Sequence, residues 1–505
     1  MRGSLALILA LGLAAPAAAE EPLSAIDWLS DVTTTPIAEP PPPPLEEQVS
    51  RGVVSETITV TPLDAPSPDA TGLLPSTVSG LPRDLWGPST GAQLRALLAR
   101  IDGDDLLPQT RELLFTLLLA ELDAPAGATA DGTFLLARVD TLRRLGAIEQ
   151  AHAMLDRAGI ATADQFEMWF DLSLFLGSET GACALLQSNA GLSRDFATRT
   201  FCLARTGDWA SAAVTFETAR ALGQLDAVEE AVLLRFLDVA LDDTAAPLSQ
   251  PSRPSPLVFH LFEAIGEPLP TTTLPVAFAV SDLRPNVGWK AQIEAAERLA
   301  RVGAISANQL LGLYTERRPA ASGGVWERVA AVQAFDQALA TSDTDLLQRH
   351  LPRAWAEMQA VGLEMSFADL YGARLTLFDL PGESGDLAHQ ISLLTDGFEE
   401  AADPRIDPFF AGIATAQIAS LTPPTPMAGA IADAFSADAP PTRYTRDIER
   451  RAIGAALLQA IDLLGTGKRG DLGKVTEALS LFRFLGLETV ARRTALELLI
   501  LSDGA

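Results

Sequence analysis

The stretch GDWASAAVTFETA at residues 207–219 indicates how this chain folds. Gly207 has the conformational freedom to end one helix, and the residues after it have the periodicity of a second helix. Ala212, five positions on, is small enough to let the two helices approach closely. Phe216 and Ala219 lie on the same helical face, where the aromatic ring fills the space between layers. The stretch therefore predicts a hairpin of two packed helices.

The same spacing recurs around three other glycines. Gly146, Gly177 and Gly207 follow one another at intervals of 31 and 30 residues, and Gly486 begins a further copy near the C-terminus. Self-similarity at such a period is typical of helical-repeat proteins. The corresponding packing positions are Ala151, Leu155 and Ala158 after Gly146, then Ala182, Leu186 and Asn189 after Gly177, and finally Ala491, Ala495 and Leu498 after Gly486.

The segment beginning Gly207-Asp208-Trp209 resembles the second half of a tetratricopeptide (TPR) unit, with Ala, aromatic and Ala residues at the expected positions 212, 216 and 219. The resemblance covers residues 131–226 and extends more loosely to 470–501. The repeat is degenerate, because its period is about 31 residues rather than 34 and the aromatic signature of the first helix is missing. The resemblance implies a TPR-like α-solenoid whose concave face binds other proteins, without naming the partner.

The rest of the body also has a helical pattern. Apolar residues recur at three- and four-residue spacings from Gly91 onward, and strand-like alternation is scarce, so we expect an all-α fold. Two Pro-rich breaks interrupt this pattern. The first break is either a loop packed along the body or a hinge, and within it only residues 257–265 have a helical pattern. The predicted breaks are residues 247–285 and 423–441, and the predicted helical blocks are residues 91–246, 286–422 and 443–501.

The N-terminus has the pattern of a secretory signal peptide. Arg2 precedes the short apolar run from Leu5 to Leu13, and small residues follow up to Ala19. A membrane anchor is the alternative, but the run is shorter than a spanning helix. We expect cleavage after Ala19. Because Arg (34 residues) far outnumbers Lys (3 residues), the composition is typical of a GC-rich bacterium, and we expect export to the periplasm.

Residues 20–90 are predicted to form a disordered, Pro-rich acidic arm. They contain 13 of the 34 Pro residues and carry a charge of 2 − 11 = −9. Two islands in the arm resemble docking motifs, one helical and one strand-like. These islands either bind a partner or fold back onto the body. Trp86, in the same segment, would also need a surface to pack on. The motif residues are Leu23, Ile26, Trp28, Leu29, Ile58 and Val60.

The chain has two cysteines, Cys183 and Cys202, both with apolar neighbours. In an oxidising compartment they would form a disulfide that closes a loop of about 20 residues. Two buried free thiols are the alternative.

Residues that carry chemistry are scattered along the chain. The net charge of −28 argues against a nucleic-acid partner. The four histidines, residues 152, 260, 350 and 389, form no zinc-binding motif. Residues 465–470 resemble a phosphate loop but have Arg469 where a hydroxyl is needed, so we interpret them as an interhelical turn. The carboxylates at positions 399, 400, 403 and 407 fit no calcium loop. We therefore expect no catalytic site, metal site or cofactor.

One segment of this acidic chain is basic. Residues 443–493 contain 10 basic and 6 acidic side chains. The excess indicates either a patch for an anionic partner or cations that stabilise the C-termini of helices. The candidate patch consists of Arg446, Arg450, Arg451, Lys468, Arg469, Arg492 and Arg493.

These observations favour an exported, non-enzymatic scaffold or adaptor that binds envelope or periplasmic proteins. A structural component of an envelope machine, such as a motor, pilus or secretion apparatus, has the same sequence properties. A peptidoglycan-binding solenoid related to cell-wall enzymes is a third alternative, which would involve contact with the cell wall. No apolar run in the chain approaches the length of a membrane-spanning helix.

Overall fold

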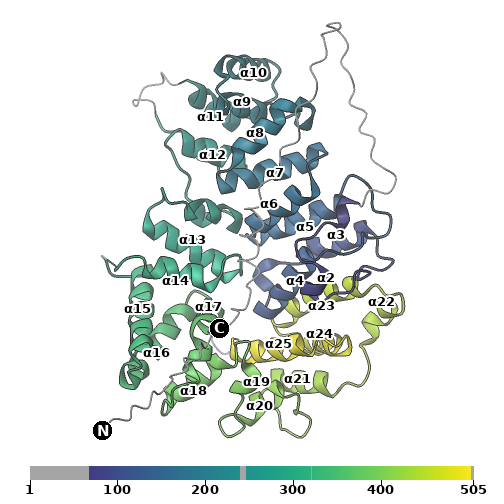
Figure 1. The fold of residues 1–505 in the computed structure, drawn as a ribbon, viewed down its shortest axis with the longest axis vertical. Helices are drawn as coiled ribbons and strands as arrows, with labels where there is room; N and C mark the ends of the chain where they lie inside the picture. The colour runs from purple at the N-terminus through teal and green to yellow at the C-terminus, as the bar shows by residue number, and fades with distance from the viewer. Residues whose placement is uncertain (1–66, 239–245, 320, 502–505) are drawn as a thin grey trace, which may run out of the picture. The chain divides into compact units, whose positions relative to one another are not determined.

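The computed structural model describes residues 67–238, 246–319 and 321–501. The described residues are helical throughout, and their only β-type pairings are two isolated bridges, Leu74 with Ala120 and Thr90 with Ala126. The all-α prediction is therefore confirmed for this part of the chain (Figure 1). No helix among these residues has both the length and the apolarity to cross a bilayer.

The N-terminal half of the described chain alternates short turns and helices. Its helices are α2 (Ser76–Ser79), α3 (Gly91–Arg100), α4 (Pro108–Leu119), α5 (Thr133–Arg144), α6 (Ile148–Ala158), α7 (Ala163–Leu176), α8 (Glu179–Ser188), α9 (Phe196–Arg205), α10 (Trp209–Ala221), α11 (Ala227–Leu237) and α12 (Pro256–Ala264).

The second half continues in the same way. Its helices are α13 (Trp289–Arg301), α14 (Ala307–Thr315), α15 (Val325–Thr341), α16 (Thr344–Gln359), α17 (Glu364–Leu375), α18 (Glu383–Ser392), α19 (Phe398–Ala401), α20 (Pro408–Ala414), α21 (Pro426–Ser436), α22 (Thr445–Glu449), α23 (Ile453–Gly467), α24 (Leu472–Phe484) and α25 (Glu488–Ile500).

The four glycines that defined the repeat each end the first helix of a hairpin. Gly146, Gly177, Gly207 and Gly486 have positive φ angles between 69° and 92°. After each of them, the next backbone N–H donates to the carbonyl five residues earlier at 2.9 Å, as Ala147 does to Leu142. This is the Schellman arrangement, which satisfies carbonyls that a helix end leaves open. The helices on either side pack on each other in the pairs α5–α6, α7–α8, α9–α10 and α24–α25.

The predicted packing positions lie mostly between these helices. The alanines five positions after the glycines, at 151, 182, 212 and 491, are fully buried. Leu155, Leu186 and Phe216 are at most 4 % exposed. Ala219 is buried, Ala158 is half-buried, and Asn189 is exposed. The third position therefore contributes to the core in only some of the hairpins.

The predicted disordered arm extends too far toward the C-terminus, because residues 67–90 pack on the body. Asp69 accepts backbone hydrogen bonds from Phe134 and Leu135 at 2.9 and 2.7 Å, which caps the start of α5. The guanidinium of Arg138, which is 1 % exposed, donates to the carbonyls of Thr71, Leu118 and Ala120. These contacts satisfy the backbone of a segment whose proline content alone predicted disorder.

Both Pro-rich breaks contain packed helices: α12 confirms the helical pattern predicted at residues 257–265 inside the first break, whereas the helix in the second break was not predicted. In the first break α12 is followed by a 3₁₀ helix, Val276–Leu283, whose Phe278 packs edge-on against Phe175 and Phe259. In the second, α21 begins with Pro426 at its first position, where the missing N–H costs nothing. Proline here marks helix starts and 3₁₀ turns.

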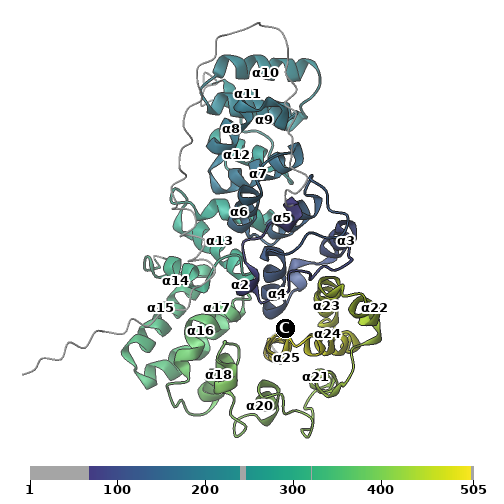
Figure 2. The same ribbon diagram turned by 45° about the vertical axis from the view of Figure 1, so that its right-hand side comes forward.

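The C-terminal helices pack on the N-terminal ones. Helix α25 contacts α4, and α23 contacts both α3 and α4 (Figure 2). We call this the α4–α25 junction, comprising α3, α4, α23 and α25. Residues 81–88 contribute to it, because the ring of Trp86 lies over Gly454 and the N–H of Gly454 donates to the carbonyl of Leu85 at 2.9 Å.

Candidate interaction surfaces

Helix α10 presents a largely apolar outer face. Among the contacts between elements of the described chain, its main partners are α9 and α11 (Figure 1). Val214 is 67 % exposed and Leu222, just after the helix, is 62 % exposed. Ala210, Ala213 and Ala221 are also exposed along the same helix. An apolar surface on consecutive helices marks a site where a protein partner can exclude water.

Apolar side chains are also exposed at the start of α10 and on the neighbouring helix α11. Trp209 begins α10 and is 46 % exposed, and its indole lies 5.9 Å from the ring of Phe236, measured between centroids. Leu234 on α11 is 41 % exposed. We call Trp209, Val214 and Leu222 the α10 face. Large amphipathic side chains such as Trp209 contribute much of the binding energy where proteins associate.

Carboxylates gather near the starts of α7, α9 and α11. Asp195 and Asp226 cap α9 and α11, and each accepts two backbone N–H groups. Burial raises the pKa of Glu229 above its usual range, against the effect of its hydrogen bond from the Asp226 N–H, and repulsion from Asp226 and then Asp195 adds to the rise. On α7, loss of solvent raises the pKa of Asp171 to about 7, although nearby Arg143 opposes the shift. These carboxylates make the surface acidic, and two of them, Asp195 and Asp226, are explained by their role as helix caps.

A cavity of about 260 Å³ lies between the end of α3 and α23. Its lining is mostly polar, and two ion pairs join residues of that lining: Arg100 with Asp462 at 2.6 Å, and Arg469 with Asp105. Both arginines are therefore neutralised by groups from the other side of the junction. The lining residues are Arg100, Ile101, Asp102, Asp105, Leu106, Ile461, Asp462, Gly465, Thr466 and Arg469.

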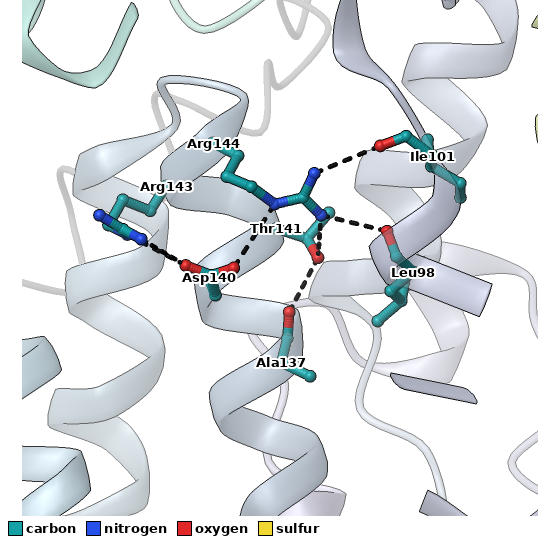
Figure 3. Close-up of polar contacts among 7 residues, drawn as sticks. All are labelled: Leu98, Ile101, Ala137, Asp140, Thr141, Arg143 and Arg144. Atoms are coloured by element: carbon teal, nitrogen blue, oxygen red, sulfur yellow. Dashed lines mark hydrogen bonds and ion pairs between the residues drawn. The ribbon is translucent and has the colours of Figure 1, made fainter. Parts of the chain in front are cut away.

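A guanidinium on α5 holds the end of α3 that forms one wall of this cavity. Arg144 donates to the carbonyls of Leu98 and Ile101 at 3.1 and 3.2 Å, and lies 3.4 Å from the carboxylate of Asp140 (Figure 3). Asp140 also pairs with Arg143 at 2.6 Å. A cation at the C-terminal carbonyls of a helix is electrostatically favourable, so Arg144 fixes α3 relative to α5.

The α4–α25 junction contains a buried carboxyl. Both oxygens of Glu497, which is 2 % exposed, accept the backbone N–H of Gln109 at 2.9 and 3.0 Å. Helix α4 has no cap of its own, so a residue almost 400 positions away serves as its N-terminal acceptor. Burial raises the pKa of Glu497 to about 8, against the opposing effects of the Gln109 N–H and Arg493. Nothing in the local sequence identifies this pair.

The predicted disulfide is present between Cys183 on α8 and Cys202 on α9. It joins successive hairpins, because α8 ends one and α9 begins the next. Close by, Glu179 is buried and pairs with Arg205 at 2.8 Å. His260 on α12 lies 3.9 Å from the same carboxylate, and burial lowers the pKa of this histidine.

The seven residues of the predicted basic patch do not form one surface. Arg492 pairs with Glu399 at 2.7 Å and Arg493 with Asp396 at 2.8 Å, and both side chains are only 13 % exposed. Lys468 donates to the carbonyl of Asp104 at 3.5 Å, and Arg469 pairs with Asp105. The other three, at positions 446, 450 and 451, lie together at α22 and are exposed. Four of the seven cations therefore hold the body together.

The remaining candidate residues serve local structure or lie outside the described residues. Gly465 and Gly467 belong to α23, so the interhelical turn predicted at 465–470 begins only after Gly467. Asp407 caps α20, and Asp403 pairs with Arg405 at 2.5 Å. No group of three or more His, Cys, Asp or Glu side chains in the described ranges could hold a metal ion. The docking-motif residues Leu23, Ile26, Trp28, Leu29, Ile58 and Val60 lie outside these ranges.

Comparison with known proteins yields no match: no family model, no curated protein and no solved structure is similar to this chain.

Proposed function

We propose that this protein is an exported, non-enzymatic scaffold that binds envelope proteins in the periplasm. The observation that carries the proposal is the α10 face, where large apolar side chains are exposed to solvent along one helix and at its end. Helical hairpins that resemble TPR units support it, since such hairpins present rigid surfaces to protein partners.

The α10 face suits a protein partner on physical grounds. Its exposed side chains are aliphatic and aromatic, and the exposed Glu217–Arg220 ion pair on the same helix adds polar groups that a partner could also bind. Burial of such side chains contributes about 25 cal/mol per Å² of apolar surface, so Val214, Leu222 and Trp209 together would supply several kcal/mol. A partner with a complementary apolar helix or groove would cover this face.

The test is affinity capture from gently solubilised envelopes. The bait is the mature chain, compared with Val214→Glu/Leu222→Glu and with the matched control Val78→Glu/Leu377→Glu. The control residues are 67 % and 79 % exposed elsewhere on the body, so both variants add two carboxylates without disturbing the core. We expect a defined protein set with the wild type and the control, reduced at least tenfold with the α10 variant. Equal capture by all three would contradict the proposal.

A second bait separates the body from the N-terminal segment. It begins at Ser67, the first residue that the structure describes, and so retains the packed residues 67–90. If this bait captures the same proteins as the mature chain, the helical body is sufficient for binding. If it captures none, the docking motifs predicted before residue 61 carry the interaction.

A further inference from the structure

Three arginines at α22 have no interaction partner among the described residues. Arg446, Arg450 and Arg451 are exposed, and their side chains make no hydrogen bond or ion pair there. We call these three residues the basic turn. The other four cations of the candidate patch are already paired within the body, as described above. The basic turn therefore brings three unpaired cations of the described residues within six positions, with the carboxylates of Asp447 and Glu449 between them, in a chain of net charge −28.

The backbone of the turn does not explain why an arginine stands at position 451. Arg451 has a φ of 58°, and the N–H of Ala452 after it donates to the carbonyl of Asp447 at 2.8 Å. This is the helix-ending position that glycine occupies at Gly146 and Gly486. Side chains disfavour this conformation, so glycine would suit the turn better. The arginine side chain thus adds nothing that the turn itself requires.

The backbone of the turn also packs against Trp86 and Gly87, at the start of the body. A Cβ added to Gly87 would lie 2.2 Å from the carbonyl oxygen of Arg451, so the two backbones are in close contact. Next to them, Trp86 is 3 % exposed and packs on Gly454. A fixed backbone keeps the Cα positions of the three arginines in place and reduces the entropy lost when a ligand binds.

We propose that the basic turn binds a short acidic segment of a partner protein. Guanidinium groups form two-pronged hydrogen bonds with carboxylates, and consecutive Asp or Glu side chains would pair with several arginines at once. The ligand must be short, since an extended anionic surface such as a membrane would also face the acidic remainder of the chain. At physiological salt, screening limits the electrostatic interaction of a short segment to charges within about 8 Å. The proposal rests on the scaffold function and adds the chemistry of one partner.

The experiment measures binding of a fluorescent octaglutamate peptide to the full mature chain by anisotropy, at 50 and 200 mM NaCl. The test variant is Arg446→Gln/Arg450→Gln/Arg451→Gln. The matched control is Arg194→Gln/Arg318→Gln/Arg374→Gln, which removes three arginines that are also exposed and have no polar partner among the described residues. We expect at least tenfold weaker binding by the test variant, less than twofold change in the control, and weaker wild-type binding at the higher salt.

A single substitution checks that the effect comes from the side chain. Arg451→Gly should raise the melting temperature by about 1–2 °C, since glycine accepts the positive φ, while weakening peptide binding at least twofold. Equal losses in the two triple variants, or no peptide binding by the wild type, would overturn the proposal. So would preferential binding to phosphatidylglycerol vesicles that the test variant abolishes. If peptide binding fails but envelope capture is intact, the scaffold proposal still stands. If only the α10 variant loses envelope capture, the result says nothing about peptide binding at the basic turn.

Discussion

The hairpins α5–α10 and the α4–α25 junction are stabilised in different ways. In the hairpins, a glycine ends one helix and a buried alanine five residues later packs against it, so the contacts join residues close in sequence. At the junction, Glu497 caps α4 and Arg100 pairs with Asp462, and both contacts span more than 350 residues. The first region can be recognised from a repeated pattern, whereas the second has no pattern to repeat.

This difference also separates two tryptophans that the sequence alone does not distinguish. Trp86 lies in a Pro-rich segment predicted to be disordered, yet it is 3 % exposed and packs edge-on against Phe134 at a centroid distance of 5.2 Å. Trp209 lies in the best-matched repeat, yet it is 46 % exposed. A regular helical context therefore does not ensure burial, and a proline-rich context does not prevent it.

The largest expected effect tests that contrast. Trp86→Ala should lower the free energy of unfolding by about 3–5 kcal/mol, because it leaves a cavity beneath Gly454 and Phe134. Trp209→Ala should cost about 1 kcal/mol or less, because nearly half of that side chain already meets solvent. Urea unfolding followed by circular dichroism measures both. Equal losses would show that residues 81–88 do not support the junction.

The next effect concerns the link between successive hairpins. Replacing both Cys183 and Cys202 with Ala should cost about 3 kcal/mol, because the disulfide closes a 19-residue separation in the unfolded chain. The same urea experiment, run with and without dithiothreitol, measures it. Reductant should destabilise the wild type and leave the double variant unchanged. A wild type insensitive to reductant under unfolding conditions would argue against the bond.

The third effect is a dependence on pH that arises at the junction. The pKa of Glu497 is about 8 in the folded chain and 4.5 when solvated, so the folded state binds the extra proton. The stabilisation is complete below pH 4.5 and is lost as pH rises toward 8, by at most about 1.4 kcal/mol per pH unit. In Glu497→Gln, unfolding free energies measured at pH 5.5 and 7.5 should differ less than in the wild type. Identical differences in both proteins would contradict a protonated Glu497.

The smallest effect compares two glycines within helical hairpins. Gly207→Ala should cost about 1–2 kcal/mol, because φ at this position is 92° and alanine disfavours it. Gly312→Ala, inside α14 with no atom within 4 Å of the added Cβ, should instead stabilise the protein by about 1 kcal/mol. Thermal melts of the two variants should shift in opposite directions. A shift in the same direction would show that the turn at Gly207 is not required.

Sequence reasoning identified the elements whose cause is local. The glycines at 146, 177, 207 and 486 marked real helix ends, because their role depends only on neighbouring backbone. The disulfide could be proposed because two cysteines allow a single pairing. The helix inside the first Pro-rich break was predicted, but residues 67–90 and 423–441 were misjudged, since proline is also well placed at the first position of a helix such as α21. The basic patch was too large, because four of its cations meet acids or carbonyls from distant segments.

By itself, the sequence of this protein determined its helical class, the hairpins that its glycines delimit and the pairing of its two cysteines. These properties follow from backbone conformation and residue spacing over a few turns. Only the tertiary structure decided that residues 67–90 belong to the body, that Glu497 caps α4, and that three of the seven candidate cations have no side-chain partner among the described residues. Those outcomes depend on contacts between residues that are far apart in the sequence. A buried polar group needs a hydrogen-bond partner, and the fold determines which distant group supplies it.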